Sequence, residues 1–266
     1  MVYFGNLTNP TVNILDEIEA IHKLGMDFVE IGMEGPEGMP EILMQKKDTI
    51  RKSLEKKGMF AIGHTSWYAE LGTPHESVRK AWLSECKRFI DVATALRLEK
   101  ITFHSHSRGM FMHHKRSKKR VLDNFVLSLR ELVEYGTKSG VMVMLENATE
   151  KREIYNIKDF SYIVSRVTDL GVHIDIGHAF MHGRMKNVEK YINAFHSRLE
   201  HLHFHDNHGK FDEHLPIGKG RINYKRVVQL LKKKNYDKTI TFEVFSKDRN
   251  MVRASANKIK VLWAMI

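Results

Sequence analysis

The sequence has few of the residues that mark secreted, fibrous or membrane proteins. Its single cysteine, Cys86, excludes an internal disulfide and a zinc cluster built from cysteine alone. Five prolines are too few for a proline-rich linker. The run Val141–Leu145 is far shorter than the ~20 apolar residues that span a bilayer. Residues Met1–Asn6 lack the basic and apolar blocks of a signal peptide, so we expect a cytoplasmic protein with no membrane partner.

The remaining composition is that of a globular protein with excess positive charge. The chain has 266 residues, of which 42% are hydrophobic and 28% charged, enough to bury a sizeable core. Lys and Arg number 43 against 32 Asp and Glu, which gives a net charge of +11. Such a charge favours a phosphorylated or nucleic-acid partner, although solvated lysines explain it equally well.

Short apolar runs alternate with longer segments of helical periodicity from end to end. The predicted strands are Val2–Gly5, Asp27–Gly32, Met59–His64, Lys100–His104, Val141–Glu146, Val172–Asp175, Leu199–His205 and Thr239–Val244. A strand and a helix repeating every ~30 residues over a chain of this length predict a (β/α)8 TIM barrel of the α/β class. An open doubly wound sheet is the alternative, but Gly5–Pro10 is no glycine-rich dinucleotide loop. With no linker or low-complexity stretch, residues 1–266 are predicted to form a single domain.

Local signals mark several helices. Stripes of apolar residues at helical spacing start at Ile14 and at Val121. Thr73 to Glu76 reads as a capping box, and Asn156 with Asp159 as a weaker helix start. Glycines are expected where helices end and strands begin, at Gly25, Gly58, Gly140 and Gly171.

Acidic and imidazole side chains close seven consecutive predicted strands. They are Glu30, His64, His104, Glu146, Asp175, His203 and Glu243. The carboxyl ends of barrel strands meet at one rim, so these groups are expected to converge there. Singly, each is more often a hydrogen-bonded structural residue than a ligand. Together they would repel or desolvate one another unless a cation compensates, which predicts a divalent metal site.

Two short spacings add to this prediction. Asp175-Ile176-Gly177-His178 places a carboxylate at a strand end and an imidazole in the following loop. Asp212 and His214 are two residues apart, so they point the same way in an extended loop. Gly218-Lys219-Gly220 supplies a tight turn near the same mouth. Carboxylate and neutral imidazole together suit Zn, Mn or Co.

An ordered set of fragments carries a family resemblance. The fragments are Gly63–Tyr68, Phe103–His106, Leu145–Asn147, Ile174–His178, His203–Asp206, Asp212–Gly220 and Phe242–Val244. In this order they resemble the xylose isomerase-like TIM barrels, a superfamily that contains sugar isomerases and epimerases as well as endonuclease IV. The resemblance covers nearly the whole chain.

The resemblance implies two alternative ligand sets. Epimerases of the tagatose epimerase type hold one divalent ion with residues that match Glu146, Asp175, His203 and Glu243. Endonuclease IV holds three zinc ions, and its additional ligands match His64, His104, His178, Asp212 and His214. We therefore expect one to three ions of Zn, Mn or Co per chain.

Each set implies a chemistry. In the isomerase or epimerase, Glu146 and Glu243 exchange a proton with the substrate as base and acid, and His178 orients a substrate oxygen. In the hydrolase, the metal centre cleaves a phosphodiester at an abasic site in DNA. One ion with three carboxylates leaves a charge of about −1, which suits a neutral sugar. Three ions with four carboxylates leave about +2, which suits a phosphate.

Flanking residues divide between the two chemistries. The basic run Lys115–Arg120 could follow a phosphate backbone or be a solvated helix start. Trp67 could stack on a base or cap a sugar pocket. His205-Asp206-Asn207-His208 departs from the endonuclease pattern, while Gly209-Lys210 stands where ketose 3-epimerases carry an arginine. Lys219 and Arg221 are therefore predicted to meet a sugar phosphate.

The leading hypothesis is a metal-dependent sugar or sugar-phosphate isomerase or epimerase. The alternatives are an endonuclease IV-like phosphodiesterase and a non-catalytic metal-binding module. Barrels of this group often pair, so a homodimer is a further expectation. Glu30 and Asp206 are expected to make structural hydrogen bonds more readily than to orient ligands, and His201 and His205 are taken as bystanders.

Overall fold

Strands and helices alternate along the whole computed structural model, which describes residues 1–107, 109–149 and 154–266. The strands are β1 Tyr3–Leu7, β2 Phe28–Met33, β3 Phe60–Thr65, β4 Lys100–His104, β5 Met142–Glu146, β6 Gly171–Asp175, β7 Leu199–Phe204 and β8 Thr239–Phe242. The longer helices are α1 Ile14–Lys23, α2 Pro40–Lys57, α3 Glu76–Leu96, α5 Lys115–Lys138, α8 Arg184–Phe195, α9 Tyr224–Lys233 and α10 Asn250–Met265. Shorter helices are α4 Gly109–Met112, α6 Ile157–Val164 and α7 Ile176–Met181, with a 3-10 turn at His196–Arg198.

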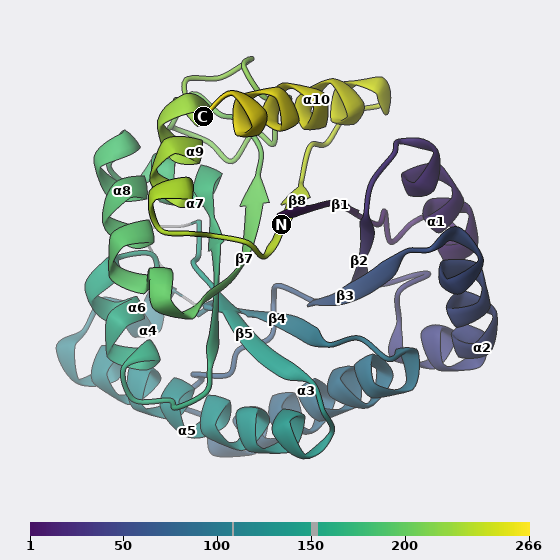
Figure 1. Ribbon diagram of the computed structural model, residues 1–266. Helices are drawn as coiled ribbons and strands as arrows, with labels where there is room; N and C mark the ends of the chain where they lie inside the picture. The colour runs from purple at the N-terminus through teal and green to yellow at the C-terminus, as the bar shows by residue number, and fades with distance from the viewer. Residues whose placement is uncertain (108, 150–153) are drawn as a thin grey trace.

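The strands form a closed parallel barrel in sequence order. Each pairs with the next, and β1 closes the circle against β8, with Phe4 opposite Ile240. The helices surround the barrel (Figure 1). The chain is therefore a (β/α)8 TIM barrel, as the alternation predicts, and the open-sheet alternative is wrong. Since every pair is parallel, all strands deliver their carboxyl ends to one mouth.

Apolar stripes attach the helices to the barrel. Ile14, Ile18 and Ile21 of α1 are almost entirely buried, as are Val121, Phe125, Leu129, Leu132 and Val133 of α5. Burial of one apolar face fixes which side of each amphipathic helix meets the strands. No helix in the described part of the chain is both long enough and apolar enough to cross a membrane.

The helix boundaries confirm some of the predicted signals. The Asn156 side chain accepts a hydrogen bond from the Asp159 amide and caps α6, as predicted. Gly58 ends α2 with a φ of 62°, which a glycine adopts readily. The capping box at Thr73 is wrong, because α3 begins at Glu76 after His75, which makes no side-chain cap. Gly171 begins β6, as predicted, but no helix ends beside it, since α6 ends at Val164.

The interior of the barrel is unusually polar. Glu30, Thr102, His173, His201 and Thr241 are all fully buried. Barrels of this class are usually filled by branched apolar side chains. Buried polar groups need hydrogen-bond partners, and those found here support the side chains at the mouth.

Candidate metal centre

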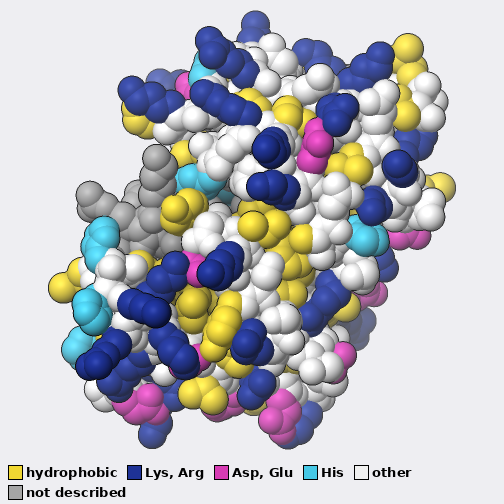
Figure 2. Space-filling view, turned by 90° about the vertical axis from the view of Figure 1, so that its left-hand side faces the viewer, with side chains coloured by type: hydrophobic (Ala, Val, Ile, Leu, Met, Phe, Trp, Pro, Cys, Tyr) yellow, Lys and Arg dark blue, Asp and Glu magenta, His cyan; other side chains and the backbone are white. Residues whose placement is uncertain are grey.

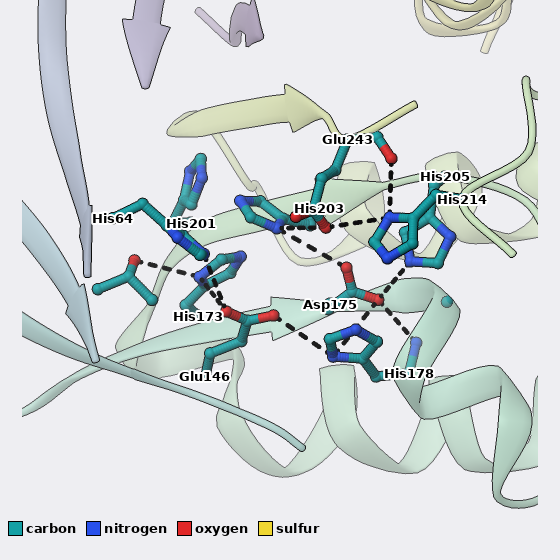
Figure 3. Close-up of polar contacts among 12 residues, drawn as sticks. His64, Glu146, His173, Asp175, His178, His201, His203, His205, His214 and Glu243 are labelled. Atoms are coloured by element: carbon teal, nitrogen blue, oxygen red, sulfur yellow. Dashed lines mark hydrogen bonds and ion pairs between the residues drawn. The ribbon is translucent and has the colours of Figure 1, made fainter. Parts of the chain in front are cut away.

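A cavity of about 1210 Å³ opens at the carboxyl ends of the strands. We divide the predicted ligands around it into three groups. The inner group is Glu146, Asp175, His203 and Glu243; the side group is His64, His104 and Glu146; the outer group is His178, Asp212 and His214. Figure 3 shows the labelled members converging from several strands, from α7 and from the loop after β7. The structure therefore brings together every metal ligand predicted from the sequence.

The inner group surrounds one nitrogen atom of His203. His203 Nδ1 lies 3.1 Å from Glu243 Oε2 and 3.8 Å from Asp175 Oδ2. Ligand atoms of Glu146, Asp175 and His203 all lie within 4.8 Å of one another. Asp175 Oδ2 and Glu146 Oε2 are buried and have no hydrogen-bond partner among the described residues. The arrangement suits a cation, because it would satisfy these oxygens at once.

Glu30 determines which nitrogen of His203 faces the site. Glu30 Oε2 lies 2.9 Å from His203 Nε2 and 3.2 Å from His201 Nε2. A carboxylate accepts hydrogen bonds, so His203 Nε2 carries the proton, and in the neutral ring Nδ1 holds a lone pair. In the neutral ring that lone pair faces the carboxylates of Glu243 and Asp175, so either a proton or a metal ion bound at this nitrogen relieves the repulsion.

The side group is equally compact. His64 Nε2 and His104 Nε2 are 3.2 Å apart. They lie 3.4 and 3.2 Å from the same Glu146 oxygen, Oε2. Glu146 therefore belongs to two groups, and its two oxygens can serve two neighbouring ions.

The outer group has the same lone-pair arrangement. His178 Nδ1 lies 2.9 Å from the carbonyl oxygen of Asn147, and His214 Nδ1 lies 3.0 Å from that of Glu243. A carbonyl only accepts, so both Nδ1 atoms carry protons, and in the neutral rings both Nε2 atoms hold lone pairs. These atoms face Asp212 Oδ2 at 3.3 and 3.0 Å. Either protons on these two nitrogens or a metal ion between them and Asp212 would satisfy these contacts.

The electrostatics agree with this interpretation. Burial would raise the pKa of Glu243, but His203 and His214 outweigh it and lower that pKa to about 2. Burial would lower the pKa of His214, but Glu243 and Asp212 raise it to about 9. The pKa of His178 is raised well above its usual value, because Asp175 and Asp212 outweigh its burial. Glu243 thus stays ionised and attracts positive charge.

Two carboxylates shape the backbone around these ligands. Asp175 ends β6 and caps α7, since its Oδ1 accepts the His178 amide at 2.7 Å. Asp206 accepts from the amides of Asn207 and Gly218 at 2.9 and 2.8 Å and from a third at residue 222. These bonds fold the loop that carries Asp212 and His214 over the mouth, so Asp206 supports the ligands from behind.

The predicted substrate contacts are only partly placed at the cavity. Trp67 lines it and is 54% exposed. Lys219 and Arg221 are not among the described residues that line it, so the prediction that they bind substrate finds no support there. Lys247 and Arg249, which follow β8, line the cavity instead. In the basic run, Lys118 and Lys119 form ion pairs with Asp159 and Asp123.

The sequence analysis missed several buried polar residues. His205 is no bystander: its Nε2 lies 3.1 Å from Asp175 Oδ1 and 3.5 Å from Asp212 Oδ1. His201 is no bystander either, because it shares Glu30 with His203. His173 lies under the site, 3.6 Å from Glu146. The sequence does carry a signal for His201 and His205. Both lie two residues from His203, and residues two apart face the same side of an extended strand such as β7, so the three imidazoles are expected on one side.

Comparison with known proteins gives the class of this barrel. The chain belongs to the xylose isomerase-like TIM barrel family, whose pattern matches residues 18–262. The solved structure of a D-tagatose 3-epimerase-like protein is 25% identical, with a TM-score of 0.86 over 99% of this chain and 97% of that one.

Two relatives match this chain over most of their own length. An uncharacterised protein of Methanocaldococcus jannaschii is 27% identical over 231 residues, 87% of this chain and 86% of that protein. A probable endonuclease 4 of Aquifex aeolicus is 25% identical over 276 residues, 94% of each chain. The chain is thus similar both to an epimerase-like structure and to a probable endonuclease.

Proposed function

We propose that the protein is a metal-dependent sugar or sugar-phosphate epimerase or isomerase that transfers a proton between Glu146 and Glu243. The observation that carries this proposal is the inner group. It joins three carboxylates and one oriented imidazole at the base of a cavity large enough for a sugar. The likeness to the D-tagatose 3-epimerase-like structure supports it.

The two glutamates have the placement that this chemistry needs. Figure 3 shows Glu146 and Glu243 on different sides of His203 and Asp175. Glu243 is ionised, with a pKa of about 2, and is therefore in the form that accepts a proton from the carbon next to the carbonyl. The pKa of Glu146 is also lowered well below its usual value, because His173, His104 and His64 outweigh its burial, so Glu146 would take up a proton from solvent before it donates one to the other face of that carbon. A divalent ion, when bound by the inner group, stabilises the negative charge that develops on the substrate oxygens.

The remaining proposed contacts position the substrate. Trp67 and Phe245, 54% and 64% exposed, line the cavity and offer flat apolar faces to a sugar ring. Lys247 lines the same cavity and suits the phosphate of a sugar phosphate. His178 is proposed to act as a ligand and, through its place beside Glu146 at 3.4 Å, to steady the proton-transfer geometry.

Deuterium exchange tests this function. Ketoses and ketose phosphates incubated with the metal-loaded protein in heavy water should gain deuterium at C3. Glu146→Gln and Glu243→Gln should each reduce the rate at least ~100-fold, the usual contribution of a general acid or base. His208→Asn is a matched control, because His208 is about half exposed and pairs with Glu213 outside the three groups. Failure of every ketose to exchange would contradict the proposal.

A second candidate is hydrolysis of abasic-site DNA by a multinuclear zinc centre. The side and outer groups favour it, because they add ligands that a single-ion epimerase does not need. The probable endonuclease 4 relative also supports it. On the side of the barrel that is on the left in Figure 1, Figure 2 shows Lys and Arg scattered and not gathered in one band. Nicking of an abasic-site duplex, lost in Asp212→Ala, would establish this activity.

A further inference from the structure

We propose that His205 completes the outer group as a closed zinc site with four protein ligands: His178, His205, Asp212 and His214. This site would fix the loop that carries Asp212 and His214 at the edge of the cavity, and substrate would bind at the inner group. The proposal rests on the metal dependence proposed above, but not on the epimerase reaction. It concerns a residue that the sequence analysis set aside.

The spacing of the four ligand atoms fits one ion. All of them lie within 4.8 Å of one another. The contacts between Asp212 and the three imidazoles are 3.0, 3.3 and 3.5 Å. Ligands bound tetrahedrally at ~2.0–2.1 Å from a zinc ion stand about 3.3 Å apart. The group therefore needs little rearrangement to close around an ion.

His205 contacts a different oxygen of Asp212 from the other two imidazoles. His178 and His214 face Oδ2 of Asp212, whereas His205 faces Oδ1. That Oδ1 atom is buried and has no hydrogen-bond partner among the described residues. The His205 ring is fully buried and stacks on His214, with ring centroids 4.1 Å apart. A buried, unsatisfied carboxylate oxygen beside a buried imidazole is costly unless an ion joins them.

Gly177 makes room for the His205 ring. A Cβ atom at position 177 would lie 2.0 Å from Cε1 and 2.3 Å from Nε2 of His205. Any side chain there would displace the imidazole from the group. The glycine between Asp175 and His178 thus has a role that its position in a helix does not explain, because glycine lowers helix stability.

The two groups prefer different metals. Three imidazoles and one carboxylate suit Zn²⁺, whereas the three carboxylates and one imidazole of the inner group suit a harder ion such as Mn²⁺. The outer site would carry a net charge of about +1 and the inner site about −1, so the neighbouring charges attract. Four protein ligands fill the tetrahedral shell of zinc, which marks a structural and not a catalytic site.

Metal binding to single variants tests the proposal without any activity measurement. Wild type, His205→Asn and the exposed control His208→Asn are equilibrated in buffered Zn²⁺ and analysed for metal per chain. We expect His205→Asn to retain one ion fewer than the other two proteins. Its zinc affinity at this site should fall at least ~10-fold, the loss seen when even an indirect partner of a ligand is removed.

Cobalt reports the geometry of the same site. Four-coordinate Co²⁺ absorbs visible light more strongly than five- or six-coordinate Co²⁺, so its band should appear in wild type and vanish in His205→Asn. His205→Phe keeps the ring beside Gly177 but has no nitrogen, and it should behave in the same way. Gly177→Ala keeps all four ligands yet displaces the ring, so it should weaken the band. Circular dichroism confirms that each variant is folded.

The outcomes distinguish failure of the His205 proposal from failure of the proposed function. If the variants at 205 bind as much zinc and give the same cobalt band as wild type, His205 merely orients Asp175 and the proposal is wrong. If wild type itself binds no ion, the metal dependence of the proposed function fails with it. Absence of ketose exchange with normal zinc and cobalt results would contradict the epimerase function alone.

Discussion

At the scale of single residues, three histidines at the mouth each have one ring nitrogen fixed by a neighbour. Glu30 fixes Nε2 of His203, and backbone carbonyls fix Nδ1 of His178 and of His214. The other nitrogen then points inward. Such partners set both the orientation and the basicity of a ligand, so residues that touch no ion still control binding.

Glu30→Gln tests this control. The amide can keep the volume but accepts less strongly and lets His203 adopt the other tautomer. We expect metal affinity at the inner group to fall about 10–100-fold, measured by competition with a chelator of known affinity. Glu200→Gln is the control, because Glu200 lies on β7 with His203 but pairs with Lys238. Equal affinity in the two variants would contradict the orienting role.

Protons should compete with metal at these histidines. His214 has a pKa of about 9 and His178 a pKa well above its usual value, so both bind protons at neutral pH before an ion binds. A ligand must lose its proton to bind, so zinc binding releases protons. We expect the apparent zinc affinity to rise from neutral pH and to level off above pH ~9. Calorimetry in buffers of different ionisation enthalpy measures this release; a pH-independent affinity would contradict it.

At the scale of elements, the loop between β7 and α9 is folded around one carboxylate. Asp206 accepts three backbone amides and exchanges two backbone hydrogen bonds with Leu215, each of 2.8 Å. Gly220 packs against it, since a Cβ there would lie 2.3 Å from Asp206 Oδ1. The position of Asp212 and His214 therefore depends on a residue that lines no part of the cavity.

Asp206→Asn should loosen this loop. The amide nitrogen cannot accept the backbone N–H groups that one carboxylate oxygen now receives. We expect a loss of about 1–3 kcal/mol in the free energy of unfolding, together with weaker zinc binding. Urea unfolding measures the first, with the exposed Asp237→Asn as control. Normal stability with weakened zinc binding would mean that the carboxylate acts on the ligands alone.

The strands and the residues that close them could be predicted from the sequence, whereas contacts made by the loops could not. The strand runs and their closing residues were visible because parallel strands buried on both faces are short and apolar. Lys219 and Arg221 do not line the cavity, and they lie in the turn whose amides at Gly218 and Ile222 bind Asp206, a contact between distant positions that the sequence does not show. Lys247 and Arg249 were missed because nothing local shows that the segment after β8 turns toward the mouth.

At the scale of the whole molecule, the polar interior couples the barrel to its mouth. Buried carboxylates from β2, β5, β6 and β8 face buried histidines from β3, β6 and β7. Without a compensating ion, this charge opposes folding. An ion that binds the native state alone stabilises the barrel through every strand that supplies a ligand.

Metal removal should therefore lower the stability of the whole protein. At a free ion concentration 100 times Kd, one bound ion adds about 2.7 kcal/mol to the free energy of unfolding. Calorimetric Tm should fall after dialysis against a chelator and recover with Zn²⁺ or Mn²⁺. An unchanged Tm in a protein shown by elemental analysis to have lost metal would contradict this coupling.

The close contact between Gly177 and the His205 ring restricts which residues relatives can carry at these two positions. Position 177 cannot take a larger residue while position 205 keeps its imidazole, because the ring fills the volume that a side chain at 177 would need. Relatives that carry a larger residue in place of the glycine should have a smaller one in place of the imidazole. Aligned relatives should therefore divide into two populations at this pair of positions.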